Sequence, residues 1–229
     1  MINSGNDIIS LDAINVNLTK QPQFYSKILT DAEVTLYKEE GFEEMPFENF
    51  VWLLWSLKES AFKFLQRNQP LMIFSPTKFV VKHLSMPLRF SEAKFNKSQI
   101  EDYGFDDEMA FKGIITIASD VLFSRSLVYQ ELIVSVVNDH SNFENTWWGI
   151  KLIDKPDPKT QSMAVRKFLA DKLQLLFHFD ELRIAKSPHG YPIVLNENKE
   201  VAISVSLSHH EHWVAYSFST AKYSFLNEQ

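Results

Sequence analysis

Residues 50–64, FVWLLWSLKESAFKF, constrain the fold more than any other stretch of the chain. A helix that is apolar nearly all round must be covered on both sides. Trp52, Trp55 and Phe62 flank one face of this segment. The opposite face carries an apolar stripe at i, i+3, i+4 and i+7 spacing, which consists of Phe50, Leu53, Leu54, Leu57, Ala61 and Phe64.

Glu59 and Lys63 lie one helical turn apart on the face away from that stripe. In the first interpretation they form an exposed ion pair, which contributes about 0.3–0.5 kcal/mol. In the second, the flanking rings make the face a partly dry crevice. A carboxylate there suits a hard divalent cation, and an ammonium suits a phosphate. The residue pattern alone leaves the two interpretations even.

Composition narrows the function classes. The chain has 229 residues, 45% of them apolar, which is ample for a packed core. A net charge of −6 argues against nucleic-acid binding, which needs a basic face. The chain has no cysteine, no apolar run long enough to span a membrane, and no signal-peptide pattern in its first residues, MINSGNDIIS. We therefore expect a cytoplasmic protein without a membrane partner.

The chain divides into two blocks in which a helix precedes strands. In the first block we expect a mobile polar loop at 91–108, a strand at 7–11, a helix at 31–37, and strands at 78–84, 111–118 and 127–137. A proline-containing connector, 154–160, opens the second block. There we expect a helix at 160–177 and strands at 181–186, 191–195, 201–208 and 213–219, the last two forming a hairpin.

In strand 201–208 apolar residues alternate with small polar ones, so we expect one buried apolar face and one unburied face of small polar side chains. His209, His210 and His212 follow at the hairpin tip. They are interpreted as solvated loop residues or as zinc ligands, although no HExxH helix is present. Asp7 by itself is interpreted as a turn residue.

Four short motifs occur along the chain: GND at 5–7, WSLKESAFK at 55–63, GYP at 190–192 and SLSH at 206–209. Together they resemble the 4'-phosphopantetheinyl transferase family. Its pattern is a Gly-x-Asp strand, W-[ST]-x-K-E-[AS]-x-x-K on a helix, a Gly-Lys-Pro-like turn and a Ser-x-Ser-His strand end. The helix motif matches at every fixed position. Residues 24–39 also resemble the segment after the first motif in small holo-acyl-carrier-protein synthases.

The motif order is that of the small, trimeric synthases, but the chain is about twice as long, as in the monomeric type built from two similar halves. The resemblance therefore implies an α+β pseudo-dimer in one chain, each half a helix packed on a small antiparallel sheet. We expect the first half at 1–145 and the second at 146–229, in swapped order relative to the larger type. The resemblance further implies a substrate cleft between the halves, with the Glu59 helix facing His209, and we expect the protein to act as a monomer.

The resemblance implies Mg²⁺-dependent transfer of the phosphopantetheine arm of coenzyme A to a serine of an apo acyl or peptidyl carrier protein, for fatty-acid or polyketide biosynthesis. Adenosine 3',5'-bisphosphate is released. Asp7 and Glu59 would hold the metal, and Lys63 would contact the pyrophosphate. Glu59 or a metal-bound water would deprotonate the serine. The other residues implied in coenzyme A binding are Lys58, Lys186, His189, Gly190, Pro192, Ser208 and His209.

Three positions depart from the family pattern. Ile9 stands where many larger members have a second acidic residue, which leaves two carboxylates for the metal. Tyr191 replaces the usual basic residue of the turn, and Lys186 and His189 are near enough in sequence to compensate. Asn6 replaces an apolar residue.

These departures motivate a second hypothesis, a non-catalytic relative that binds coenzyme A or a carrier protein. A third is a zinc-dependent hydrolase that uses the histidine tip. The sequence does not identify the carrier protein.

Overall fold

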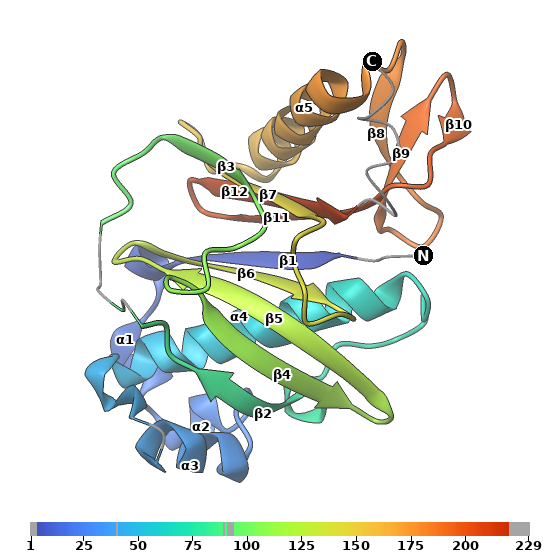
Figure 1. Ribbon diagram of the computed structural model, residues 1–229. Coiled ribbons are helices and arrows are strands. Elements are labelled where there is room, and N and C mark those ends of the chain that lie inside the picture. Colours follow the sequence, from blue (N-terminus) through green and yellow to red (C-terminus); the bar gives the residue numbers. More distant parts are fainter. Residues whose placement is uncertain (1–3, 40, 89, 91–93, 220–229) are drawn as a thin grey trace.

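Helix α4 (Phe47–Gln66) packs against a five-stranded antiparallel sheet (Figure 1). The computed structural model describes residues 4–39, 41–88, 90 and 94–219. Strand order in this sheet is β1-β6-β5-β4-β2. The strands are β1 (Gly5–Ser10), β2 (Val80–Ser85), β4 (Phe111–Ile117), β5 (Asp120–Val128) and β6 (Leu132–Asn138).

The other side of α4 is also covered, as its sequence requires. Short helices lie against it, and the Trp52 indole donates a hydrogen bond to Thr19. Phe74, in the loop after α4, packs against the rings of Trp55 and Phe62. These helices are α1 (Val16–Thr19), α2 (Pro22–Tyr25) and α3 (Asp31–Glu39), with 3₁₀ turns at Leu11–Ala13, Phe42–Glu44 and Pro76–Lys78.

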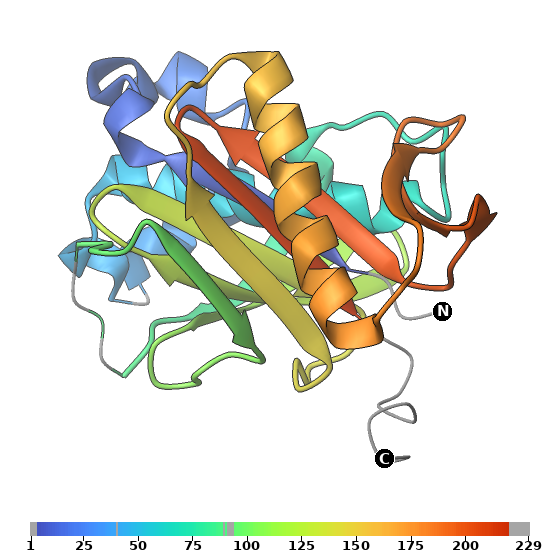
Figure 2. The same ribbon diagram turned by 90° about the horizontal axis from the view of Figure 1, so that it is seen from above.

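A second, four-stranded sheet has the order β11-β12-β7-β3 and is crossed by helix α5 (Pro158–Phe177), as Figure 2 shows. Asp157 caps the start of α5, where its side chain accepts the Thr160 N–H. The strands are β3 (Gln99–Tyr103), β7 (Thr146–Leu152), β11 (Ser204–His210) and β12 (Trp213–Ser219). A small sheet beside it contains β8 (Leu182–Lys186), β9 (Pro192–Asn196) and β10 (Lys199–Glu200).

The two large sheets meet where the free edge of β1 lies on β11 (Figure 1). Side chains of β11 take the place of a neighbouring strand. The backbone N–H groups of Ser4 and Asn6 donate to Ser204 Oγ at 3.2 Å and Ser206 Oγ at 3.0 Å. The N–H of Ser10 donates to His210 Nδ1 at 2.8 Å. Buried strand-edge groups are thereby satisfied without a continuous sheet.

The expected α+β class with antiparallel sheets is confirmed. The division into two similar halves stays a prediction, and β3, from within 1–145, pairs with β7 of the other large sheet. No helix in the described part of the chain is both long and apolar enough to cross a membrane.

Three expectations were wrong. Residues 127–137 form two strands joined by a turn, not one strand, because β5 ends at Val128 and β6 begins at Leu132. The expected loop 91–108 contains β3, although its residues 91–93 lie outside the described part. The serine face of β11, expected to be unburied, is buried because β1 covers it.

Candidate active site

Gly5 allows α4 to approach β1 closely. A Cβ atom at this position would lie 2.1 Å from the carbonyl oxygen of Ser60 and 2.8 Å from the backbone nitrogen of Phe64. Only glycine therefore fits under this part of the helix. The close approach brings Asp7, two residues along the strand, next to the polar face of α4.

Three of the predicted site residues meet at this contact. The Lys63 ammonium lies 2.9 Å from Asp7 Oδ1 and 3.1 Å from Glu59 Oε1. The Trp55 indole N–H donates to the second oxygen of Glu59 at 3.0 Å and so orients that carboxylate. Side-chain exposure is 5% for Asp7, 23% for Lys63 and 28% for Glu59. The cluster is therefore partly buried, which contradicts the interpretation as an exposed ion pair.

Burial and neighbouring charges shift the two most buried groups. Burial raises the pKa of Asp7 to about 6, with Lys63 opposing this shift and Glu59 adding to it. For Lys63, burial opposes the charged form, but the Asp7 and Glu59 carboxylates outweigh it and raise the pKa. The ammonium is therefore held in its charged state between two acids.

A divalent cation fits this donor set. Asp7 Oδ2 is buried and has no hydrogen-bond partner among the residues that the structure describes. Mg²⁺ takes oxygen ligands and is often held by only one or two carboxylates together with substrate phosphates. No group of three or more His, Asp or Glu side chains able to hold a metal occurs within the described ranges. Asp7 and Glu59 are therefore the candidate protein ligands.

The three histidines at the hairpin do not form such a group. His210 Nδ1 accepts the Ser10 N–H, so a neutral ring carries its proton on Nε2. His212 Nδ1 lies 3.0 Å from the carbonyl oxygen of Ile153. His209 is exposed overall, yet partial burial lowers its pKa, as does the nearby Lys63. These separate partners give the zinc interpretation no support.

A hollow of about 180 Å³ lies between α5, the end of β8, the GYP turn and β11. It brings together four residues that the family pattern implies in coenzyme A binding: Lys186, Gly190, Pro192 and His209. Arg166 of α5 also lines it and contributes to the lowered pKa of His209. Sequence reasoning missed Arg166, because an arginine in an amphipathic helix resembles any solvated charge.

Lys58 does not join the site, and the expectation for it was wrong. Its side chain is 0% exposed and pairs with Glu33 at 2.7 Å. It also donates to the Ile28 carbonyl at 2.6 Å. The Glu33 carboxylate accepts further hydrogen bonds from Thr30 and from the Val81 N–H. Lys58 is thus a core residue that joins α4 to α3 and β2.

Two other predicted ligands lie apart from the hollow. Ser208 is buried, and its hydroxyl accepts the Asn6 side-chain N–H at 2.7 Å, so it belongs to the contact between β1 and β11. This contact also gives Asn6 a role that the sequence did not show. His189 is exposed in the turn, with its ring 6.5 Å from that of Tyr191, and does not line the hollow.

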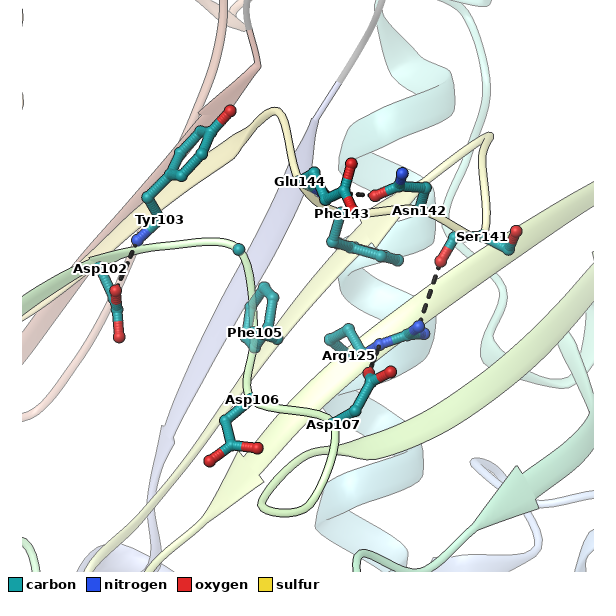
Figure 3. A pocket seen from close by; sticks show the side chains of 11 residues that line it. Asp102, Tyr103, Phe105, Asp106, Asp107, Arg125, Ser141, Asn142, Phe143 and Glu144 are labelled. Atoms are coloured by element: carbon teal, nitrogen blue, oxygen red, sulfur yellow. Dashed lines mark hydrogen bonds and ion pairs between the residues drawn. The ribbon is translucent and has the colours of Figure 1, made fainter.

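A larger hollow, about 610 Å³, lies between the loops that connect the two large sheets (Figure 3). The positively charged residue that lines this hollow, Arg125, already has partners within it. Arg125 pairs with Asp107 at 3.4 Å, donates to the Ser141 carbonyl at 3.1 Å and lies over the Phe143 ring. None of the predicted site residues lines this hollow, and we assign it no function.

Comparison with known proteins agrees with the motifs. Residues 4–101 match the model of the 4'-phosphopantetheinyl transferase superfamily. The matched segment contains β1, α4 and therefore the whole Asp7, Glu59 and Lys63 cluster. No curated protein and no solved structure matches the chain. The resemblance to this transferase superfamily is confirmed over the matched segment, which is less than half of the chain.

Proposed function

We propose that this protein transfers the 4'-phosphopantetheine arm of coenzyme A to a serine hydroxyl of an apo carrier protein and releases adenosine 3',5'-bisphosphate. The observation that supports this most is the convergence of Asp7 and Glu59 on Lys63, within the segment that matches the superfamily. The serine oxygen forms a bond to the β-phosphorus of coenzyme A, and the bond from that phosphorus to the bridging oxygen breaks. The proton leaves the serine, and the bisphosphate departs with the bridging oxygen.

This chemistry needs positive charge at the pyrophosphate, because negative charge develops on the leaving phosphate. Asp7 and Glu59 would hold Mg²⁺, which neutralises that charge when it is bound. The assignment is supported by Asp7 Oδ2, which has no hydrogen-bond partner in the described part of the chain.

Lys63 is the second source of positive charge. In the structure its ammonium occupies the position between the two carboxylates. A divalent cation would compete for the same oxygens, so Lys63 would then be available to a phosphate oxygen. Its side chain is 23% exposed, which supports access of that phosphate from solvent. The ammonium is well suited to this role as a compact point charge.

The hollow beside α5 would receive the nucleotide end of coenzyme A. Lys186, His209 and Arg166 line it and would surround a phosphate with three donors. Arg166 is held in place by the carbonyl of Ser162 at 3.0 Å. A neutral His209 still donates one hydrogen bond, so its lowered pKa does not remove it from this set.

Deprotonation of the attacking serine falls to Glu59 or to a water beside it. The Trp55 N–H holds one carboxylate oxygen of Glu59. The other oxygen faces Lys63. It would accept the proton only if Mg²⁺ did not occupy it, and with Mg²⁺ at that oxygen the proton would go to a water beside Glu59. The cleft residues come from one chain, and we propose that the monomer is active in the cytoplasm.

The proposal is tested by mass spectrometry of an apo carrier protein incubated with this protein, coenzyme A and Mg²⁺. We expect the carrier mass to rise by one phosphopantetheine arm. A carrier with alanine in place of the acceptor serine is the matched control and should gain nothing. Binding of coenzyme A without any mass gain, across acyl and peptidyl carriers, would show instead a non-catalytic relative.

A further inference from the structure

The polar face of α4 extends beyond the cluster already described. Glu59, Lys63 and Arg67 follow each other at intervals of four residues, so they lie on one face of the helix. Arg67 is the C-cap residue of α4. Its side chain is partly buried.

Arg67 makes three contacts with the GYP turn and β11. One guanidinium nitrogen, Nη2, donates to the carbonyl of Pro192 at 2.7 Å and also to the carbonyl of Val205. The centre of the guanidinium group lies 5.3 Å from the centre of the Tyr191 ring, within the range of a cation–π interaction. One side chain therefore joins the end of α4 to the GYP turn and to β11.

These contacts lie on the two segments that carry the proposed coenzyme A-binding residues of the hollow. The GYP turn follows Lys186 and contributes Gly190 and Pro192 to the hollow, while β11 carries His209 four residues after Val205. On the other side, Lys63 is one helical turn from Arg67. Binding of a coenzyme A molecule that reached from the hollow to the cluster would depend on the distance between the residues of the hollow and Lys63.

We propose that Arg67 is a positioning residue that holds the GYP turn and β11 at a fixed distance from Lys63 and Glu59. This inference rests on the proposed function. It also explains Tyr191, which replaces a basic residue of the family pattern. The face of the Tyr191 ring attracts the Arg67 cation, so the turn is held by a cation from α4 instead of carrying a cation itself.

Arginine suits this role better than lysine. Its planar guanidinium can stack on a ring while its fixed N–H groups donate to carbonyl oxygens. A lysine at this position keeps the positive charge but cannot make the stacked contact and both hydrogen bonds with the same geometry. Arg67→Lys should therefore recover only part of the effect of losing the side chain.

The test compares Arg67→Met, Arg67→Lys, Tyr191→Ala and Tyr191→Phe with the wild-type protein. Arg183→Met is the matched control, because Arg183 is an exposed arginine that contacts Asn198 outside the hollow. KM for coenzyme A, kcat and the melting temperature are measured for each variant. Calorimetry with adenosine 3',5'-bisphosphate gives a Kd that does not depend on transfer.

We expect Arg67→Met to raise KM for coenzyme A and the Kd for the bisphosphate by roughly ten- to a hundredfold, the range for loss of a residue that orients binding groups without touching the ligand. Arg67→Lys and Tyr191→Ala should show smaller increases, and Tyr191→Phe and Arg183→Met none. The value of kcat should fall less than KM rises. The melting temperature of each variant shows whether a loss of binding or activity comes only from unfolding.

A lowered melting temperature with unchanged KM and Kd would overturn the positioning role, as would an effect of Arg183→Met equal to that of Arg67→Met. If Arg67→Met does not fold, Arg67→Lys and Tyr191→Ala decide by the same two constants. A wild-type protein that neither transfers the arm nor binds the bisphosphate refutes the proposed function itself, and this inference with it. An active wild type in which Arg67→Met, Arg67→Lys and Tyr191→Ala leave KM and Kd unchanged refutes the inference alone.

Discussion

Asp7 is a carboxylate with only 5% of its side chain exposed and one oxygen without a hydrogen-bond partner among the described residues. Its raised pKa means that the folded protein binds this proton more tightly than the unfolded chain does. Ionisation of Asp7 therefore opposes folding as the pH rises from about 4 to about 6. A buried charge that works against stability is typical of functional sites, where a bound cation or substrate compensates for it.

The titration of Asp7 can be followed by the ¹³C chemical shift of its carboxyl group. We expect an inflection near pH 6 in the wild-type protein. Because the Lys63 charge lowers this pKa, Lys63→Met should move the inflection to higher pH. Asp157, an exposed helix cap whose pKa its hydrogen bonds with Thr160 lower, is the internal control and should titrate below 3.8 in both proteins. An Asp7 inflection near 4, or a downward shift in Lys63→Met, would contradict the assigned environment.

The sequence predicted this site in part. Glu59 and Lys63 could be placed on one helix face, and the motif linked them with Asp7. Lys58 and Lys63 could not be told apart, because both are lysines in the same motif and the burial of one depends on Glu33, 25 residues earlier. Arg67 and Arg166 were missed for a similar reason, since their contacts come from β9, β11 and the hollow.

Among the elements, the contact of α4 with β1 has the strictest steric requirement. Gly5 lies directly below backbone atoms of the helix, which cannot move without shifting the whole element. Gly113 in β4 is also crowded, but its close neighbour at 2.4 Å is the side-chain oxygen of Ser124, which can rotate. An alanine at Gly5 would clash with helix backbone, whereas an alanine at Gly113 would meet a side chain that can rotate, so the two substitutions form a matched pair.

Gly5→Ala should destabilise the protein by roughly 1–3 kcal/mol or more, the cost typical of inserting volume into a packed interior. Gly113→Ala should cost clearly less. Chemical denaturation of both variants under the same conditions measures the difference in the free energy of unfolding. Equal losses, or a stable Gly5→Ala variant, would show that α4 can move away from β1 and that the site does not depend on their close approach.

Elements with strong periodicity were predicted well. The helix over 160–177 corresponds to α5, and the strands over 78–84 and 111–118 correspond to β2 and β4. The β5–β6 hairpin was missed because its turn, residues 129–131, contains neither glycine nor proline. The β4–β5 turn places Ala118 at φ 49°, a conformation that alanine rarely adopts, so the residue types gave no turn signal there.

At the scale of the whole molecule, the two large sheets are held together through residues 200 positions apart. Ser4, Asn6 and Ser10 each contact the side chain of the residue 200 places later. A serine row on a strand resembles a solvent face, so the sequence could not show that β1 would cover it. The contact of β1 with β11 carries Asp7 on one strand and His209 on the other. Arg67 adds a second connection, from the end of α4 to the GYP turn and β11.

The catalytic role of the Asp7, Glu59 and Lys63 cluster is tested most directly by the rate of arm transfer for Lys63→Ala at saturating Mg²⁺. Lys167→Ala is the matched control, because Lys167 forms an i,i+4 pair with Asp171 on the exposed face of α5. We predict a rate roughly ten- to a thousandfold lower for Lys63→Ala, as expected for the loss of one electrostatic stabiliser, and an unchanged rate for Lys167→Ala. Equal rates for the two variants, with similar melting temperatures, would contradict a catalytic role for the cluster.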